Sequence, residues 1–361
     1  MTISSFHLDR RTFLSTVATV VAASALPRQV VAAKTGRIGF AMGTYMVPRY
    51  KNLDKPNFEE AVRAGGYDPV VVQANDNVDQ QLQDVQNLLS QGVDVLVIIP
   101  VVSNTAVSMV RLAKRDGVPV IAYNTAIPSG DVAAFVSRDN RSVGRQAAQA
   151  AADTVGLEGK WVIASGQAGN AVADEVTAGY FEVLQPQIDA GAVEIVSHEY
   201  HASWDPEEAR QQTEDALTAS GDDIKGVFAN NDGMAGGAIA ALERQGLAGK
   251  VFVSGQDATT EACRYILEGK MTLSSFTRFD VMGQIAGDLA VKLARGEAIS
   301  APMQYTMGDV TVPLYPVEDF NVTRDNIADY FAQYSPGYVD ASAALNGLSD
   351  DILPEGVAQY R

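Results

Sequence analysis

The sequence predicts an α/β protein built from two successive doubly wound units, in which parallel strands alternate with covering helices. Short apolar runs rich in valine and isoleucine recur along the chain, and segments with apolar residues at helical spacing separate them. Continuous apolar strands that are joined through helices are typical of a parallel sheet buried on both faces. The length of 361 residues also exceeds what one ordinary core accommodates, so two domains are expected.

The first unit begins at residue 37. Strands are expected at 37–42, 69–73, 93–100 and 118–123, and helices at 58–64, 78–91 and 105–116. The helix at 78–91 illustrates the reasoning, because Leu82, Val85 and Leu89 recur at helical spacing and form one apolar stripe. The pattern changes near 135–140, where we place the first changeover between the units.

The second unit repeats this plan. Strands are expected at 161–164, 193–200, 224–229 and 251–254, and helices at 172–184, 206–219, 233–245 and 260–268. Asp205 followed by Pro206 is a good helix start, because aspartate caps a first turn and proline fits within it. A further strand at 271–276, a helix at 281–295 and an extended segment at 303–313 follow. Beyond residue 321 the pattern decays, and 336–361 is interpreted as a peripheral extension.

Residues 1–33 are predicted to be a secretory signal of twin-arginine type and not part of the fold. Arg10 and Arg11 precede an apolar stretch at 17–26, and residues 31–33 supply the small side chains that a signal peptidase prefers. The apolar stretch is too short to span a bilayer. We therefore expect a soluble periplasmic protein that is not inserted in the membrane.

Composition excludes several classes of function. The formal net charge of −17 leaves no basic surplus for phosphates, so neither nucleic acid nor an anionic membrane is an expected partner. Cys263 is the only cysteine and cannot form an intramolecular disulfide. No histidine-rich metal spacing, phosphate-binding loop or nucleophile elbow occurs, so we expect no metal, no cofactor and no catalysis.

Polar side chains stand at the ends of two successive strands of the second unit. Asn231 and Asp232 follow one strand, and Asp257 follows the next. The carboxyl ends of strands in an open α/β sheet face a crevice where ligands bind. Amides and a carboxylate together supply the donors and acceptors that a polyhydroxylated ligand needs. Helix capping is the alternative interpretation, and we assign that structural role to Asp232.

The residues at these positions resemble those of periplasmic sugar-binding proteins of the ribose/galactose branch, and within it the D-xylose-binding proteins. The segments that carry the resemblance are 93–100, 139–144, 231–237 and 254–258. It covers roughly residues 36–327 and implies the type I periplasmic binding protein fold, with two Rossmann-like lobes joined by a three-strand hinge. It also implies that a monosaccharide is enclosed between the lobes and delivered to an inner-membrane ABC permease, and a monomer is expected.

The resemblance implies lobe boundaries as well. The N-terminal lobe is expected at 34–138 plus 279–307, the C-terminal lobe at 139–278 plus 308–335, and the extension at 336–361. The crossings between the lobes should fall near 135–140, 275–280 and 303–310, and the helix at 281–295 should return to the first lobe.

Candidate ligand-binding residues follow from the xylose-binding pattern. Arg49 and Tyr50 look like the Arg-Trp pair of the family, a multiple donor beside a stacking platform. Trp204 resembles a sugar-contacting tryptophan, and Asn231 and Asp257 match an amide and a carboxylate at strand ends. The remaining candidates are Asn124, Thr125, Asn170 and Thr277.

The chain departs from the family at three positions. Asn124 and Thr125 stand where the family has an Asp-Arg pair, and Thr277 stands where it has a lysine. Two cations and one carboxylate are thus replaced by neutral or shorter groups. We therefore expect the pocket to tolerate a larger or positively charged ligand: a hexose, an amino sugar or a sugar alcohol, besides a xylose-like pentose. Asn170 lies in a loop where the alignment is offset, so its counterpart in the family stays open.

Two other functions fit the same fold. A sugar-responsive repressor would need a basic helix-turn-helix ahead of the first lobe, where this chain has an export signal. A periplasmic sensor partner, which presents its ligand-closed surface to a chemoreceptor or signalling receptor, would use the same lobes and stays open as the alternative.

Overall fold

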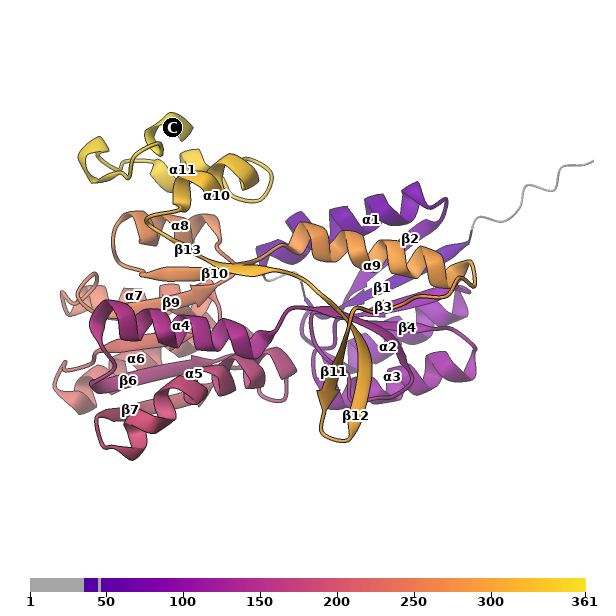
Figure 1. Cartoon of the computed structure of the whole chain (residues 1–361), viewed down its shortest axis with the longest axis horizontal. Coiled ribbons are helices and arrows are strands. Elements are labelled where there is room, and N and C mark those ends of the chain that lie inside the picture. Colours follow the sequence, from indigo (N-terminus) through magenta and orange to yellow (C-terminus); the bar gives the residue numbers. More distant parts are fainter. Residues whose placement is uncertain (1–35, 45–46) are drawn as a thin grey trace, which may run out of the picture. The chain divides into compact units, whose positions relative to one another are not determined.

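The computed structural model describes residues 36–44 and 47–361, so the predicted signal at 1–33 lies outside the described residues. The described chain forms two sheets of mostly parallel strands with helices packed on them (Figure 1), which confirms the predicted α/β class. None of the helices in this part of the chain has the length and apolarity that crossing a membrane requires.

The first sheet has the strand order β11-β12-β5-β4-β3-β1-β2, and all neighbours are parallel except the hairpin of β11 and β12. Its strands are β1 (Arg37–Met42), β2 (Asp68–Gln73), β3 (Val95–Ile98), β4 (Val120–Tyr123), β5 (Val132–Ser137), β11 (Met303–Met307) and β12 (Val310–Pro316). On one face lie α1 (Lys55–Ala64) and α9 (Phe279–Ala294), and on the other lie α2 (Val78–Ser90) and α3 (Ser103–Arg115) (Figure 1).

The second sheet has the order β13-β10-β9-β8-β6-β7, and β13 is its one antiparallel strand among the described residues. Its strands are β6 (Gly159–Ser165), β7 (Val193–Tyr200), β8 (Gly226–Ala229), β9 (Phe252–Gln256), β10 (Leu273–Thr277) and β13 (Asp319–Thr323). The helices beside it are α4 (Asn140–Val155), α5 (Ala171–Asp189), α6 (Pro206–Ser220), α7 (Asp232–Arg244) and α8 (Thr260–Leu267). Figure 1 shows α4 and α5 together on one face and α6 and α7 on the other.

The chain passes between the sheets after β5, after β10 and after β12. The first two passages lie where the resemblance implied them, and α9 returns to the first sheet. The third, expected near 303–310, is wrong: β12 pairs with β5, so the return falls between Pro316 and Asp319. The reason is burial, because Val312 and Leu314 of β12 pack into the core of the first sheet. Apart from this shift, the lobe boundaries stay a prediction.

The segment at 336–361 is not peripheral in its packing. Tyr338, Val339, Leu345 and Val357 are all buried. The segment follows α10 (Ile327–Tyr334) and contains α11 (Ala341–Leu345) and the short 3-10 turns η3 (Asp350–Ile352) and η4 (Ala358–Tyr360). Its buried residues are scattered along the sequence and not periodic, which is why the pattern did not predict their burial.

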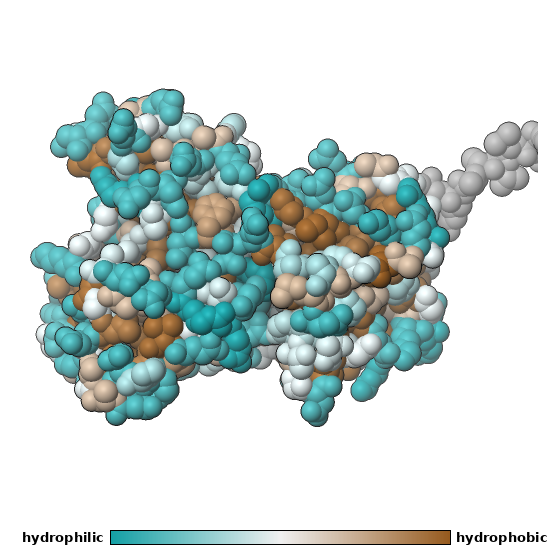
Figure 2. Space-filling view, in the orientation of Figure 1, coloured by the Kyte–Doolittle hydropathy of each residue, from teal (hydrophilic) through white to brown (hydrophobic). Residues whose placement is uncertain are grey.

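The polarity of the outer surface agrees with the charged composition of the chain. Hydrophilic residues cover most of the face in Figure 2, as expected for a chain with a formal net charge of −17.

Candidate functional site

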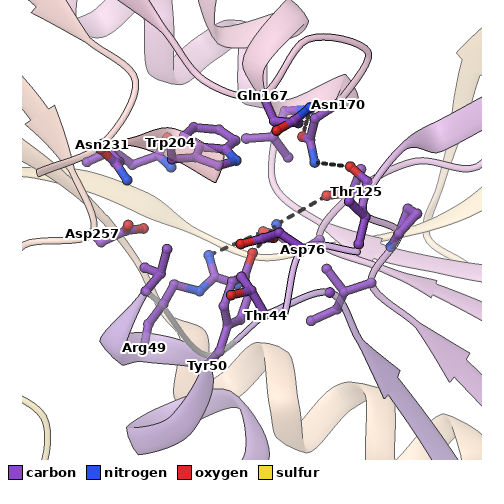
Figure 3. A pocket seen from close by; sticks show the side chains of 18 residues that line it. Thr44, Arg49, Tyr50, Asp76, Thr125, Gln167, Asn170, Trp204, Asn231 and Asp257 are labelled. Atoms are coloured by element: carbon purple, nitrogen blue, oxygen red, sulfur yellow. Dashed lines mark hydrogen bonds between the residues drawn. The ribbon is translucent and has the colours of Figure 1, made fainter. Parts of the chain in front are cut away.

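A pocket lies at the carboxyl ends of the strands of both sheets (Figure 3). Segments after β1 to β4 line one side, and segments after β6 to β9 line the other. The lining residues are Gly43, Thr44, Val47, Arg49, Tyr50, Asp76, Ile99, Pro100, Val101, Asn124, Thr125, Gln167, Asn170, Val172, Trp204, Asn231, Gln256 and Asp257. Strand-end polar groups therefore converge as expected for open α/β sheets, and every predicted site residue except Thr277 is among them.

Arg49 is a fixed cation on the wall from the first sheet. It precedes a π-helical turn, η1 (Tyr50–Asp54), and its Nη2 and Nε donate to the two carboxylate oxygens of Asp54 at 2.8 and 3.2 Å. Its Cζ lies 3.4 Å from the ring centroid of Phe279 at the start of α9. Burial alone lowers the pKa of Arg49, but the charge of Asp54 together with those of Tyr50 and Asp257 outweighs it, and the pKa is raised above its ordinary value.

Asn124 links the polar groups of this wall. It adopts a left-handed backbone with φ 61°, which asparagine tolerates better than most residues. Its Oδ1 accepts from Nη1 of Arg49 at 3.3 Å, and its Nδ2 donates to the Tyr50 hydroxyl at 3.3 Å and to Thr125 Oγ1 at 3.5 Å. Burial raises the pKa of Tyr50 to about 12, so its hydroxyl keeps its proton at neutral pH.

Trp204 provides an apolar surface on the opposite side. It ends the short turn η2 (Ala202–Trp204) after β7, where Ser203 N donates to Gln167 Oε1 at 2.7 Å. The indole ring lies against the backbone of Gly166, where an added β-carbon would come within 2.4 Å of ring atoms. The faces of sugar rings carry C–H groups, and an indole is a suitable surface for them to stack on.

Asn170 joins the loops of the two sheets at the rim of the pocket. Its Oδ1 caps the start of α5, and its Nδ2 donates to Val101 O at 3.4 Å. Two further hydrogen bonds lie beside it: Ser103 N donates to Gly169 O at 3.2 Å, and Ala171 N donates to Ser103 Oγ at 3.2 Å. Much of the capacity of the Asn170 amide is thus used within the protein.

Asn231, and not Asp232, caps α7, so the expected role of Asp232 is wrong. Asn231 has the extended backbone that a cap residue needs, and its Oδ1 accepts from Met234 N at 2.9 Å. Asp232 accepts instead from the Ser274 hydroxyl and from Thr259 N, the latter at 2.8 Å. Burial raises the pKa of Asp232 to about 8. Through these two hydrogen bonds, the Asp232 side chain connects the start of α7 to β10 and to the loop after β9.

Asp257 places a buried carboxylate at the end of β9. Only 3% of the residue is exposed, and its backbone N–H donates to Ser275 O at 2.7 Å. Burial raises the pKa of Asp257 to about 6, against the opposing charges of Arg49 and Arg138. The carboxylate is thus ionised at neutral pH but titrates close to it.

The structure does not bring Thr277 to the pocket lining. Thr277 ends β10 opposite Asp319 of β13, is 1% exposed, and its Oγ1 has no hydrogen-bond partner within the described residues. Its hydroxyl sits directly on Cβ, so it does not extend as far as the lysine of the family pattern would.

Arg138, which the sequence patterns did not indicate as a site residue, is a buried cation near the pocket. None of its three guanidinium nitrogens has a hydrogen-bond partner in the described part of the chain, and Cζ lies 5.9 Å from the ring centroid of Phe279. Burial, followed by repulsion from Arg49, lowers the pKa of Arg138 to about 10, while Asp257 and Asp319 oppose this. The sequence predicted the loss of two family cations and kept Arg49, and the structure adds Arg138 as a second buried cation whose charge acts on Asp257.

Four further polar residues of the lining were missed. They are Thr44, Asp76, Gln167 and Gln256. Each lies at or just beyond the end of a strand that the apolar runs did predict, so the strand-end rule would have found them if applied to every strand. Among the described residues no group of histidine, cysteine, aspartate or glutamate side chains is arranged to hold a metal ion. The lining offers amide, hydroxyl, carboxylate and guanidinium groups together with two aromatic rings.

Comparison with known proteins extends these observations. A sequence profile of the family described as "Periplasmic binding protein domain" matches residues 38–298. The chain is similar to the D-xylose-binding periplasmic protein of Escherichia coli (strain K12), with 34% identity over 297 residues that cover 82% of this chain and 89% of that protein. It is also similar to the xylitol-binding protein of Mycolicibacterium smegmatis, with 27% identity over 90% of this chain and 89% of that protein.

Solved structures show the same similarity. A carbohydrate transporter solute-binding protein from Chloroflexus aurantiacus, in complex with D-glucose, matches with a TM-score of 0.75 and 25% sequence identity. The match covers 89% of this chain and 99% of that one.

Proposed function

The chain belongs to the periplasmic binding protein family, and we propose that it captures a neutral monosaccharide or sugar alcohol in the pocket and delivers it to an ABC importer. The observation that carries this proposal is the composition of the lining. Neutral amides, hydroxyls, the carboxylates of Asp76 and Asp257 and one guanidinium surround the same space as an indole and a phenol ring. A polyhydroxylated ligand needs this combination, because each hydroxyl both donates and accepts while the C–H faces stack on rings.

The charges near the pocket favour a neutral ligand. Arg49 is paired with Asp54, and the unpaired Arg138 lies near the carboxylate of Asp257. These charges offset one another, so the charges near the pocket give a cationic amino sugar only the attraction of Asp76, a second lining carboxylate whose pKa burial raises. The proposal is thus narrower than the expectation from sequence, and xylose-like pentoses, hexoses and alditols remain within it.

The proposed roles of the lining residues follow from their chemistry. Trp204 and Tyr50 present rings to the sugar, the Asn231 amide donates to its hydroxyls, and the Asp257 carboxylate accepts from them. Arg49 donates from the opposite wall, held in place by its ion pair. Buried polar groups left without a partner cost about 1–3 kcal/mol each, so a sugar lacking one hydroxyl is discriminated against.

Thermal shift of residues 34–361 with D-xylose, xylitol, D-glucose and D-glucosamine, followed by calorimetry, tests the proposal. A ligand at about 100 times its dissociation constant adds about 2.7 kcal/mol of stability. We expect at least one neutral sugar or alditol to stabilise the protein, and Asp257→Ala and Trp204→Ala to weaken binding strongly without abolishing it. Asp309→Ala, at an exposed turn, is the matched control and should bind normally. A well-folded protein that responds only to D-glucosamine, or to none of the four, would contradict the proposal.

Cellular location and delivery belong to the same proposal. Export by the twin-arginine route is expected to fail when Arg10 and Arg11 are both replaced by lysine, with the protein then retained in the cytoplasm. Deletion of the gene should abolish uptake of the bound sugar. Loss of a signalling response with normal uptake would instead favour the sensor role.

A further inference from the structure

Asp257 and Ala258 both have left-handed backbone conformations, in the turn that follows β9. Their φ angles are 102° and 49°. Residues with a β-carbon adopt such conformations at a cost, and they persist only where the surrounding structure holds them. The turn that carries Asp257, the carboxylate proposed to bind the ligand, must therefore be held in place by contacts with other parts of the chain.

Two buried tyrosine hydroxyls act on this turn. The Tyr338 hydroxyl donates to the carbonyl oxygen of Asp257 at 2.9 Å, and the Tyr330 hydroxyl donates to that of Ala258 at 2.7 Å. The N–H of Asp257 donates to Ser275 O, so the residue is held on both sides. Holding the two carbonyls fixes the peptide planes, and these set the direction in which the Asp257 side chain leaves the backbone.

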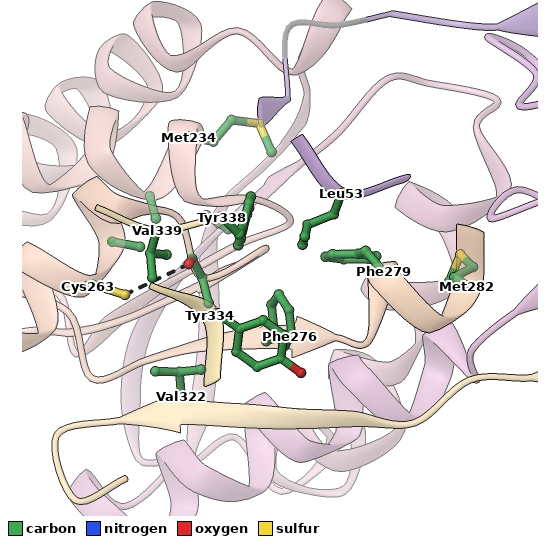
Figure 4. Close-up of a cluster of buried hydrophobic side chains, with 14 of the residues drawn as sticks. Leu53, Met234, Cys263, Phe276, Phe279, Met282, Val322, Tyr334, Tyr338 and Val339 are labelled. Atoms are coloured by element: carbon green, nitrogen blue, oxygen red, sulfur yellow. Dashed lines mark hydrogen bonds between the residues drawn. The ribbon is translucent and has the colours of Figure 1, made fainter. Parts of the chain in front are cut away.

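Tyr338 belongs to the C-terminal tail at 336–361, which lies beyond the family match at 38–298. In Figure 4 its side chain lies in the buried cluster that also holds Tyr334 and Phe276. The ring centroids of Tyr338 and Phe276 are 5.9 Å apart. The Tyr338 ring is packed in the core, and this packing holds its hydroxyl at the turn.

The tail is anchored beside the turn by its own contacts. Asp340 N donates to Thr260 Oγ1 at 2.9 Å, and Arg264 Nη1 donates to Asn346 O at 2.7 Å. Val339 is fully buried. These contacts join the tail to α8, the helix that starts just after the strained turn.

We propose that Tyr338 is a positioning residue through which the C-terminal tail aims the Asp257 carboxylate into the pocket. The inference rests on the proposed function, since it assigns Asp257 a role in holding the ligand. The tail thereby takes part in sugar affinity without touching the sugar.

Tyr338→Phe removes the hydroxyl and keeps the ring. We expect the dissociation constant for the sugar identified above to rise by up to about tenfold, the factor that one hydrogen bond of ordinary strength represents. Tyr334→Phe is the matched control, because the Tyr334 ring lies in the same cluster and its hydroxyl has no hydrogen-bond partner among the described residues. Its affinity should equal that of the wild type.

A double-mutant cycle separates positioning from general stability. If Tyr338 acts through the Asp257 side chain, Tyr338→Phe in an Asp257→Ala background should change the dissociation constant by less than about twofold. The same fold-loss in both backgrounds would overturn the proposal.

Hydrogen–deuterium exchange of the ligand-free protein gives a readout that needs no sugar. Exchange of the amides at 257–259 should be faster in Tyr338→Phe and in Tyr330→Phe than in the wild type, and unchanged in Tyr334→Phe. Unchanged exchange in both variants would overturn the inference even where sugar binding is established. Faster exchange in a protein that binds no sugar would support the restraint on the turn and contradict only the proposed function.

Discussion

The proposed role of Asp257 predicts a pH range for binding, because burial brings the pKa of its carboxyl close to neutrality. Sugar hydroxyls donate to the ionised carboxylate, so a bound sugar favours the deprotonated form. Burial raises the pKa of the ligand-free group to about 6. We expect the dissociation constant to rise by up to about tenfold for each pH unit below about 6, and to level off above about pH 7. The raised pKa also means that Asp257 favours the folded state at acidic pH, a contribution lost as the pH rises through about 6.

Calorimetry between about pH 5 and about pH 8 measures this dependence. Asp257→Asn keeps the size of the side chain but cannot titrate, so it should bind more weakly and without the change near pH 6. A pH dependence that persists in Asp257→Asn would assign the titration to another group.

Arg138 adjusts this titration, because its charge lowers the pKa of Asp257. Arg138→Met removes the cation and keeps much of the volume, so the midpoint of the binding profile should move above about pH 6. Arg278→Met is the control, since Arg278 forms an ion pair with Asp280 and its side chain is 32% exposed. The assignment fails if both variants retain the wild-type midpoint in the same calorimetric titration.

At the scale of the elements, the turn after β6 and the turn η2 are packed together, because the Trp204 ring of η2 lies against Gly166 after β6. A β-carbon at position 166 would come within 2.4 Å of the Trp204 ring, so Gly166→Ala should displace the indole from the pocket wall. We expect the affinity for the sugar to fall by about tenfold, the scale of one lost stacking contact. Gly130→Ala, where an added β-carbon meets nothing within 4 Å, should bind as the wild type does.

Tryptophan fluorescence reports this change directly. The only other tryptophan, Trp161, is fully buried with its ring centroid 4.9 Å from that of Phe228. A sugar-dependent change in emission is therefore expected from Trp204, and it should be lost in Gly166→Ala. Wild-type emission and affinity in this variant would show that the indole accommodates the extra methyl group.

Elements with strong apolar runs were predicted from sequence, and elements without them were not. β8 and β9 each contain a short apolar run followed by polar residues, so both their positions and the Asn231 and Asp257 that follow them could be found. The helix α4 is rich in alanine, and β13 alternates polar and apolar residues at a sheet edge, so neither produced a clear signal. Strand order and the late return after β12 depend on long-range pairing, which periodicity does not encode.

Local sequence patterns likewise predicted only part of the candidate site. Arg138 directly follows β5 and precedes Asp139, and on sequence alone charged residues in such a place are interpreted as solvent-exposed. Thr277 was carried over from the family pattern by position, although its side chain is too short to act as the lysine does. The contact of Tyr338 with Asp257 spans 81 residues and involves a hydroxyl and a backbone carbonyl, so local sequence patterns do not predict it.

At the scale of the whole described molecule, the pocket is shared between two sheets that are connected only by the passages after β5, β10 and β12 within the described residues. A few short connections between two packed units are the places where hinge motion occurs. In this structure the rim of the pocket is joined by hydrogen bonds between the start of α3 and the segment that leads into α5. A ligand that contacts both walls would favour this joined arrangement, and its apparent affinity would include the free energy of the rim contacts.

Ser103 offers a way to test this coupling without touching the lining. Its Oγ accepts from Ala171 N at the rim, so Ser103→Ala removes one hydrogen bond of the joined arrangement and leaves every lining residue in place. We expect the dissociation constant to rise by about two- to tenfold, as the loss of one ordinary hydrogen bond predicts, with little change in the melting temperature of the ligand-free protein. Ser108→Ala is the control, because the Ser108 hydroxyl on the same helix donates only to the local carbonyl of Thr105 among the described contacts. Small-angle scattering with and without sugar completes the test: if Ser103→Ala weakens binding, the ligand-free variant should be more expanded than the wild type, whereas unchanged affinity would mean that the rim contacts contribute nothing to capture.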